Sequence, residues 1–285
     1  MPSVPNRSAL MAAAARAAHL EVDRPPFLFE DTLARQLLGD QGDEPLAYQR
    51  TSGAHPILAR TRLVTTARAQ YAERRLADAV QRGVRQYVIL GAGLDSFAYR
   101  SPLGDLEVYE VDRPEASAWK RDRLAAAGIP VPALAHLVSL DLGREPLLPG
   151  LAEHGFDAGR PAFVSWLGVT MYLPAHVIAA TLDEIGEFVP ASELVFDHAL
   201  SPDERDAEGA EYAVLAAQIG AANGEPWVTV LSVAEAGTMA AQAGLEIIAH
   251  PLLEDWVERQ MWHRQDGLRP SRLWAMVYAR VPAAT

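Results

Sequence analysis

The sequence contains no cysteine, and of its 25 basic residues only Lys120 is a lysine. Without cysteine the chain can form no disulfide, catalytic thiolate or cysteine metal site, and the redox state of its compartment stays open. The motif HExxH is absent, and His250, Glu254 and His263 are too loosely spaced for a helical pair of histidine ligands. We therefore expect no metal.

Long hydrophobic runs and an excess of positive charge are also missing. Residues 2–20 are rich in apolar side chains, but Arg16 interrupts them and no apolar run reaches 18 residues. We therefore expect neither a secretory signal nor a membrane span, and a cytoplasmic enzyme. The 25 basic and 37 acidic residues give a net charge of −12, which would repel a nucleic acid. A small-molecule or peptide substrate is expected; the oligomeric state is left open.

The order of hydrophobic patterns predicts an α/β fold. Helices come first and alternating strands and helices follow, which requires right-handed parallel crossovers and hence a doubly wound sheet. The stretch before the last strand contains Gly267 and Pro270 and lacks a crossover helix, so this strand is expected to return antiparallel. Helices are predicted at 8–18, 31–38, 56–82, 114–127, 174–188, 204–222 and 233–243, a loop at 39–53, and strands at 87–90, 106–111, 136–140, 161–167, 193–199, 245–250 and 272–281.

Residues 86–100, QYVILGAGLDSFAYR, predict a strand, a glycine turn and a helix start. Gly91, Ala92 and Gly93 form the turn, where a larger side chain would hold the backbone away from a ligand. Asp112 follows Gly91 by 21 residues and ends a second apolar run, where its carboxylate can accept both hydroxyl hydrogens of a ribose. The combination indicates a nucleoside cofactor.

The acid that follows the turn favours one class of cofactor. Asp95 would repel a pyrophosphate but would be favourable beside a sulfonium and an ammonium group. S-adenosylmethionine therefore fits this turn better than NAD. Two alternatives stay open: an NAD(P)-dependent Rossmann oxidoreductase, and a protein that binds S-adenosylmethionine without turnover.

Six segments, in order along most of the chain, carry a family resemblance: RAAHLEVDRPPFLFEDTLARQLL, RAQYAERRLADAVQRGVRQYVILGAGLDSFAYR, VYEVDRP, SLDL, FVSWLGVTMYLP and DGLRPS. They resemble the leucine carboxyl methyltransferase family, in particular its bacterial branch of S-adenosylmethionine-dependent O-methyltransferases, which includes enzymes that esterify polyketide carboxyl groups. The resemblance implies a class I methyltransferase with a seven-stranded sheet. It also implies a single domain, 1–285, with a helical lid at 1–55 and a cofactor-binding core at 56–285.

The resemblance assigns cofactor roles to individual residues. Arg68 stands where the family binds the methionine carboxylate, a role that suits a guanidinium fork, although a solvated helix face is the alternative. The family's threonine and arginine after this position are replaced by Ala69 and Gln70. The glycine turn would approach the methionyl and ribose groups, and Asp112, or Glu110 in its place, would take the ribose hydroxyls.

Two further positions concern the ends of the third and fourth strands. Asp141 and Leu142 match the acid and apolar pair that receives and covers the adenine, although an acid after a strand is more often a cap. Leu167 stands where many members place a glutamate for the cofactor's ammonium group, so that contact must come from a backbone carbonyl, from Asp95 or from nothing.

Methyl transfer from a sulfonium is an in-line displacement, so a carboxylate acceptor needs no base, whereas a phenol or alcohol would profit from one. Tyr172 follows strand four and His198 lies at the end of strand five, where open α/β sheets bind ligands. These two are the catalytic candidates, although packing roles are the alternative. Arg16 and His19 share a helix face and could reach the site when a lid closes. Four tryptophans could line an apolar acceptor pocket or the core: Trp227, Trp256, Trp262 and Trp274.

Overall fold

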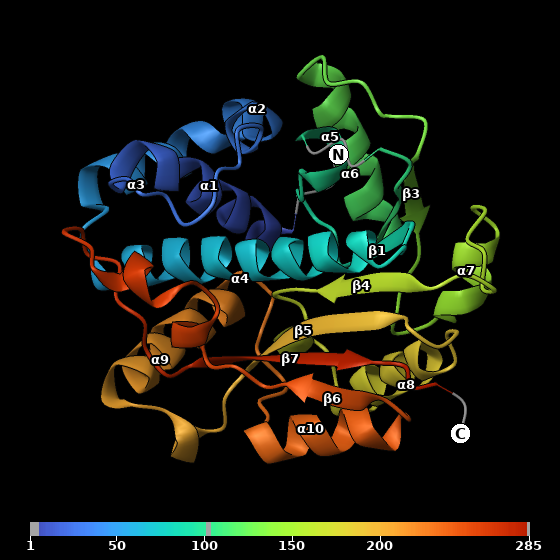
Figure 1. Ribbon diagram of the computed structural model, residues 1–285. Coiled ribbons are helices and arrows are strands. Elements are labelled where there is room, and N and C mark those ends of the chain that lie inside the picture. The colour runs from blue at the N-terminus through green and yellow to red at the C-terminus, as the bar shows by residue number, and fades with distance from the viewer. Residues whose placement is uncertain (1–5, 101–103, 284–285) are drawn as a thin grey trace.

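The computed structural model describes residues 6–100 and 104–283 and contains one seven-stranded sheet of order β3-β2-β1-β4-β5-β7-β6 (Figure 1). Strands β1 to β5 are parallel, and β7 runs antiparallel to both β5 and β6. The predicted doubly wound sheet with an antiparallel last strand is therefore confirmed. The strands are β1 (Gln86–Leu90), β2 (Glu107–Asp112), β3 (Ala135–Ser139), β4 (Ala162–Trp166), β5 (Glu193–Ala199), β6 (Glu246–Ala249) and β7 (Trp274–Arg280).

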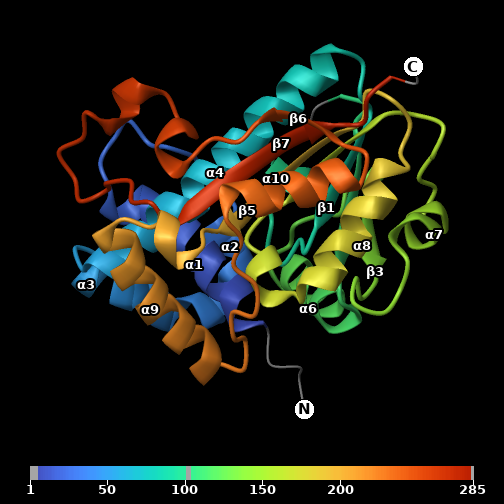
Figure 2. The same ribbon diagram turned by 90° about the horizontal axis from the view of Figure 1, so that it is seen from below.

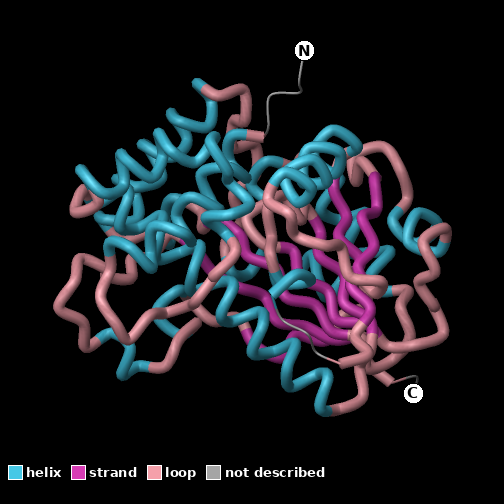
Figure 3. Tube along the Cα trace, turned by 90° about the horizontal axis from the view of Figure 1, so that it is seen from above, coloured by secondary structure: helices cyan, strands magenta, loops and turns pink. Residues whose placement is uncertain are grey.

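Helices cover both faces of this twisted sheet (Figures 2 and 3). One core layer joins the sheet to α4 and α9, and a second joins its other face to α7, α8 and α10. None of the helices in the described part of the chain is long and apolar enough to span a membrane. These later helices are α5 (Phe97–Arg100), α6 (Pro114–Ala126), α7 (Leu147–Ala152), α8 (Ala175–Gly186), α9 (Ala207–Ala222) and α10 (Val233–Gln242); short 3₁₀ turns are η2 (Thr170–Tyr172), η3 (Pro202–Glu204), η4 (Leu253–Asp255) and η5 (Arg259–Trp262).

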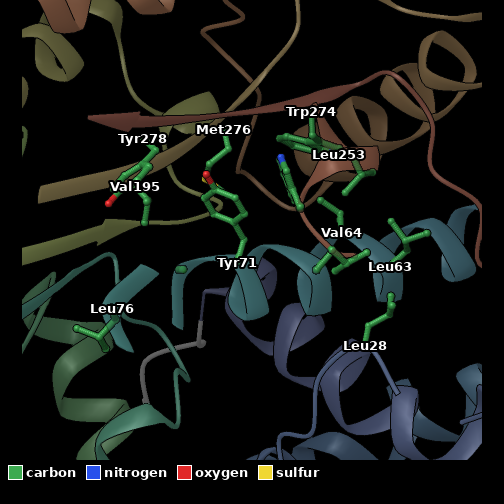
Figure 4. Close-up of a cluster of buried hydrophobic side chains, with 14 of the residues drawn as sticks. Leu28, Leu63, Val64, Tyr71, Leu76, Val195, Leu253, Trp274, Met276 and Tyr278 are labelled. Atoms are coloured by element: carbon green, nitrogen blue, oxygen red, sulfur yellow. The ribbon is translucent and has the colours of Figure 1, made fainter. Parts of the chain in front are cut away.

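Helix α4 (Pro56–Gln81) is the longest helix of the described chain and has apolar residues on two sides. Pro56 starts it, where a missing N–H costs nothing, and Gly83, with φ +102°, follows its C-cap. Tyr71 packs toward Met276 of β7, whereas Leu63 meets Leu28 of the N-terminal segment (Figure 4). Helix α4 therefore lies between the sheet and the N-terminal helices.

Three helices precede α4: α1 (Arg7–Val22), α2 (Ala34–Leu38) and α3 (Asp43–Ser52), with the turn η1 (Gly39–Gly42). Helix α1 packs on α4, and α2 and α3 pack on α1. The buried alanines of α1 allow the neighbouring helices to approach it closely. Arg62 of α4 binds both carboxylate oxygens of Asp23 at 2.8 Å. The predicted loop at 39–53 is wrong, because α3 occupies most of it. Pro45 stands in its first turn, where no helical bond is lost, and Leu46 is fully buried.

Candidate functional site

The carboxyl ends of the parallel strands meet at one edge of the sheet. Leu90, the last residue of β1, pairs with Val111 of β2 and with Trp166 of β4. Trp166 in turn pairs with Phe196 of β5. The loops after β1 and β4 therefore lie side by side where the strand order reverses, which is where open α/β sheets bind ligands.

The glycine turn after β1 is fixed by packing within the protein. Gly91 and Gly93 have φ values of +66° and +46°, which side-chain-bearing residues rarely adopt. A Cβ on Gly91 would lie 2.4 Å from Val169, and one on Gly93 would lie 3.0 Å from Ala9 of α1. The packing of the loop after β4 and of α1 therefore requires glycine at these two positions. Ala92 between them is buried.

Asp112 joins the end of β2 to this turn. Its Oδ2 accepts a hydrogen bond from the backbone N–H of Gly93 at 2.7 Å, and its Oδ1 accepts one from Arg113 at 2.8 Å. Burial raises the pKa of this carboxyl, and the two N–H donors counteract the rise. Each oxygen keeps lone-pair capacity for one more donor, as two ribose hydroxyls would require.

Glu110 lies two residues earlier on the same face of β2, but it is fully buried. Its Oε2 lies 2.8 Å from Nζ of Lys120 in α6 and accepts the Tyr99 hydroxyl at 2.7 Å. Burial raises the pKa of Glu110, and Lys120 counteracts the rise. The carboxylate of Glu110 is thus held by Lys120 and Tyr99, which leaves Asp112 as the acid of β2 for the ribose hydroxyls.

Arg68 of α4 reaches the loop after β4. Its Nη1 donates to Oδ2 of Asp197 in β5 at 3.3 Å, and a Cβ on Gly168 would lie 2.3–2.6 Å from the guanidinium. Oδ1 of Asp197 accepts the backbone N–H of Gly168 at 2.5 Å. Sequence reasoning missed Asp197, although an acid near the carboxyl end of a largely apolar strand was the available signal. Leu167, just before Gly168, packs against the core layer of α4.

Three other predicted cofactor residues lie at this edge, each in a local turn. Asp95 accepts the N–H of Phe97 at 2.8 Å, at the start of α5. Asp141 accepts the N–H of Gly143 at 2.9 Å, and its side chain is 32% exposed. Leu142 is partly buried against the core layer of α8. Asp141 and Leu142 follow β3, so they lie beyond Asp112 along the edge.

Tyr172 lies in η2, on the side of the site that faces away from β3. Burial raises the pKa of its hydroxyl, while Trp227 and the charge of Arg68 counteract the rise. Trp227 contacts Trp274 edge to face at a ring distance of 5.3 Å. Ser8 of α1 donates its N–H to Glu225 at 2.9 Å, so α1 meets the segment after α9 here. Trp256, by contrast, is fully buried in the core.

His198 points to the opposite face of the sheet from Asp197, because neighbouring strand residues alternate. Its Nδ1–H donates to the Leu231 carbonyl at 3.1 Å, so its Nε2 accepts from Nε2–H of His250 at 2.9 Å. Burial, with His250 beside it, lowers the pKa of His198 to about 3. Both ring nitrogens are thus occupied, which disagrees with the expected base and fits a structural group.

A buried polar network ties α1 to the glycine turn. Arg16 donates to Asp31 at 2.8 Å and to the Leu94 carbonyl at 2.7 Å, and Ser96 donates to Asp31 at 2.6 Å. Arg16 therefore binds the residue that directly follows the turn. The expectation that His19 shares this role is wrong, because its ring is fully buried between Asp23 and the N–H of Leu28.

Comparisons with known proteins identify the family of the chain. The family model "Leucine carboxyl methyltransferase" matches residues 9–186. The chain is 30% identical to the "Putative S-adenosyl-L-methionine-dependent methyltransferase YktD" of Bacillus subtilis (strain 168), over 92% of this chain and 93% of that protein. A protein of Mycolicibacterium paratuberculosis (strain ATCC BAA-968 / K-10) that carries the same description without a gene name is 35% identical over 68% and 65%.

Two solved structures share the fold at low sequence identity. A "putative methyltransferase" from Thermobifida fusca YX has a TM-score of 0.62 at 19% identity, over 87% of this chain and 92% of that one. A DUF574 family protein from Streptomyces avermitilis MA-4680 also has a TM-score of 0.62, at 16% identity, over 96% and 97%. These likenesses support the sheet order and the placement of its helices.

Proposed function

Because the chain belongs to the leucine carboxyl methyltransferase family and is an S-adenosylmethionine-dependent methyltransferase, we propose that it methylates a carboxylate oxygen. The acceptor would be a small molecule of the secondary-metabolite type or a peptide. Family membership decides against the NAD(P)-dependent oxidoreductase.

The observation that carries the choice of acceptor is the state of His198. A phenol or alcohol must lose its proton during the transfer, and a nearby base speeds that step. Both nitrogens of His198 already have partners, and its pKa of about 3 reflects its burial beside His250. A carboxylate is ionised at neutral pH and loses no proton, so its methylation does not need the base that His198, bonded on the other face of the sheet, would have supplied.

The residues at the carboxyl edge fit the proposed cofactor. Arg68 would bind the methionine carboxylate with a charge-assisted fork, and Asp112 would accept the two ribose hydroxyls. The glycine turn would lie along the methionyl and ribose groups, with Asp95 supplying negative charge near it. Asp141 and Leu142, after β3, would receive the adenine.

When bound, S-adenosylmethionine would supply a methyl group on a positively charged sulfur. In-line transfer to an acceptor oxygen would form the O–CH3 bond, break the S–CH3 bond and leave the neutral thioether S-adenosylhomocysteine. The protein's part is to align the two molecules and to exclude water. Tyr172 would donate its hydroxyl to the second oxygen of the acceptor carboxylate, because burial raises its pKa and keeps it protonated. Trp227 and Trp274 would provide apolar contacts for the rest of the acceptor.

The helices of residues 1–55 would act as the lid, and residues 56–285 as the cofactor-binding core. Arg16 of α1 binds the residue after the glycine turn, Ala9 lies against the turn, and Ser8 binds Glu225 beside Tyr172. These contacts support a position of α1 over both ends of the proposed site. Opening of α1 would therefore admit cofactor and acceptor, and its closure would exclude water.

The test uses S-adenosylmethionine with a radiolabelled methyl group and a panel of carboxylic acids, phenols, alcohols and short peptides. A carboxyl methyl ester releases labelled methanol in mild base, whereas a methyl ether or methylamine keeps its label. We expect base-labile label on carboxylic acids. Label that survives base on the best acceptor would refute the carboxylate, and tight cofactor binding without transfer to any acceptor would support the binding protein instead.

A further inference from the structure

We propose that Asp197 is a positioning residue of the cofactor site, which holds the guanidinium of Arg68 against Gly168 in the orientation that binds the methionine carboxylate. The inference rests on the role proposed above for Arg68. It assigns a function to a buried acid that lies outside the sequence motifs.

The carboxylate of Asp197 joins three elements of the site. Oδ2 accepts from Nη1 of Arg68 in α4, and Oδ1 accepts from the N–H of Gly168 in the loop after β4. Thr170 of the same loop donates its hydroxyl to the backbone carbonyl of Asp197 at 2.7 Å. Residue 197 therefore fixes the arginine and the loop on which it rests.

Gly168 shows how closely Arg68 is held. Its φ of +71° requires glycine, and any side chain would overlap the guanidinium. A guanidinium has five N–H donors, and the hydrogen bond to Asp197 is the one protein bond that Arg68 donates within residues 6–100 and 104–283. The side chain is 14% exposed. Its remaining donors are thus available to a carboxylate ligand while one nitrogen is anchored.

Charge gives a second reason for the pair. The amino-acid end of S-adenosylmethionine carries one negative carboxylate, one positive ammonium and one positive sulfonium, so its net charge is positive. An unpaired arginine would repel that group as a whole, whereas the Arg68–Asp197 pair is neutral. Asp197 thus lets an arginine recognise the carboxylate without repelling the rest of the ligand.

The position of Asp197 is unfavourable for stability alone. Its side chain is fully buried, and burial raises its pKa, with Arg68 and the Gly168 N–H counteracting the rise. An apolar residue on a central strand often serves stability as well as, or better than, a buried charge. A buried charge that contributes little or nothing to stability is expected where the residue serves a functional site.

Titration calorimetry on the full chain tests the proposal with two ligands. S-adenosylmethionine has the amino-acid end, and 5′-methylthioadenosine lacks it. Asp197→Asn keeps the shape and an acceptor for Gly168 but removes the charge beside Arg68. We expect it to weaken S-adenosylmethionine at least tenfold and to change 5′-methylthioadenosine less than twofold. Because Asp197 acts through Arg68, the double variant should bind S-adenosylmethionine no more weakly than Arg68→Ala.

Glu193→Gln is the matched control, because Glu193 is another buried acid of β5. It binds Arg82 and Tyr278 at the amino end of the strand, far from the site edge. We expect this variant to bind both ligands like the unmodified protein. Circular dichroism verifies the fold of every variant.

Three outcomes would overturn the proposal: unchanged S-adenosylmethionine binding in Asp197→Asn, an equal loss for both ligands, or a further loss of the same size when Asp197→Asn is added to Arg68→Ala. The two proposals can fail separately. If Arg68→Ala binds S-adenosylmethionine normally, the role of Arg68 is wrong. If Arg68→Ala weakens binding and Asp197→Asn does not, only the positioning role is wrong.

Discussion

Replacement of Lys120 by methionine should destabilise the protein in a strongly pH-dependent way. Lys120 and Glu110 form an ion pair whose side chains are only 2% and 1% exposed. Methionine fills a similar volume but leaves the carboxylate of Glu110 with the Tyr99 hydroxyl as its remaining donor. A buried carboxylate without its cation takes up a proton rather than staying charged.

The expected loss of unfolding free energy in Lys120→Met follows from the protonation of Glu110. Glu110 has a reference pKa of 4.5, and binding a proton at pH 7 costs about 1.4 kcal/mol per pH unit above this value, or about 3 kcal/mol. A loss of this size agrees with the ~3–5 kcal/mol typical of removing one partner from a buried pair. Because the folded-state pKa is raised further, the folded state binds the extra proton, and the variant loses stability as pH rises.

Urea unfolding followed by circular dichroism at pH 5.5 and pH 7.5 measures the loss of unfolding free energy and its dependence on pH. The deficit of Lys120→Met relative to the unmodified protein should be about 3 kcal/mol smaller at pH 5.5. The double variant Glu110→Gln with Lys120→Met carries no charge at these two positions and should lose less stability, with little pH dependence. A deficit of Lys120→Met below about 1 kcal/mol at pH 7.5, or one that ignores pH, would refute the reasoning.

Three further variants test the site and its surroundings. Asp112→Asn should weaken S-adenosylmethionine and 5′-methylthioadenosine alike, by roughly tenfold in calorimetry, because the ribose is common to both ligands; selective loss of one would contradict the ribose role. Gly168→Ala should lower the free energy of unfolding by about 1–2 kcal/mol and weaken S-adenosylmethionine, because φ is +71° and the new methyl group meets Arg68; normal binding would show that Arg68 can move at no cost. Burial raises the pKa of Glu73 to about 7, against the Arg100 charge, so stability should fall by about 1 kcal/mol between pH 6 and pH 8, and Glu73→Gln should remove that slope in urea unfolding. A slope that persists in Glu73→Gln would assign it to another group.

The strands could be predicted because each depends on a short apolar run, and the crossovers fix their direction. Helix α3 could not, since Gly39, Gly42 and Gly53 around it are typical of loops. Its stability comes from packing, with Leu46 buried against the other N-terminal helices. Local signals for helix formation are weak where tertiary contacts decide.

The site shows the same division between local and distant contacts. Asp112 and the glycine turn were found because strand ends and turns have sequence patterns. Asp197 binds Arg68 across 129 positions, a pairing that no local pattern contains. The misplaced role of His198 has a different cause: the histidine does end a strand at the right edge, but it faces the other side of the sheet and meets His250.

Because Lys120 is buried, proteolysis at this residue can be used to follow the unfolding of α6. It is the one lysine in the sequence, and its ε-amino group is enclosed between α6 and β2. A lysine-specific protease therefore has a single internal site, which becomes accessible only when α6 leaves the sheet. Cleavage there would divide the chain into 1–120 and 121–285, so the rate at which two fragments appear would time that opening without any introduced label.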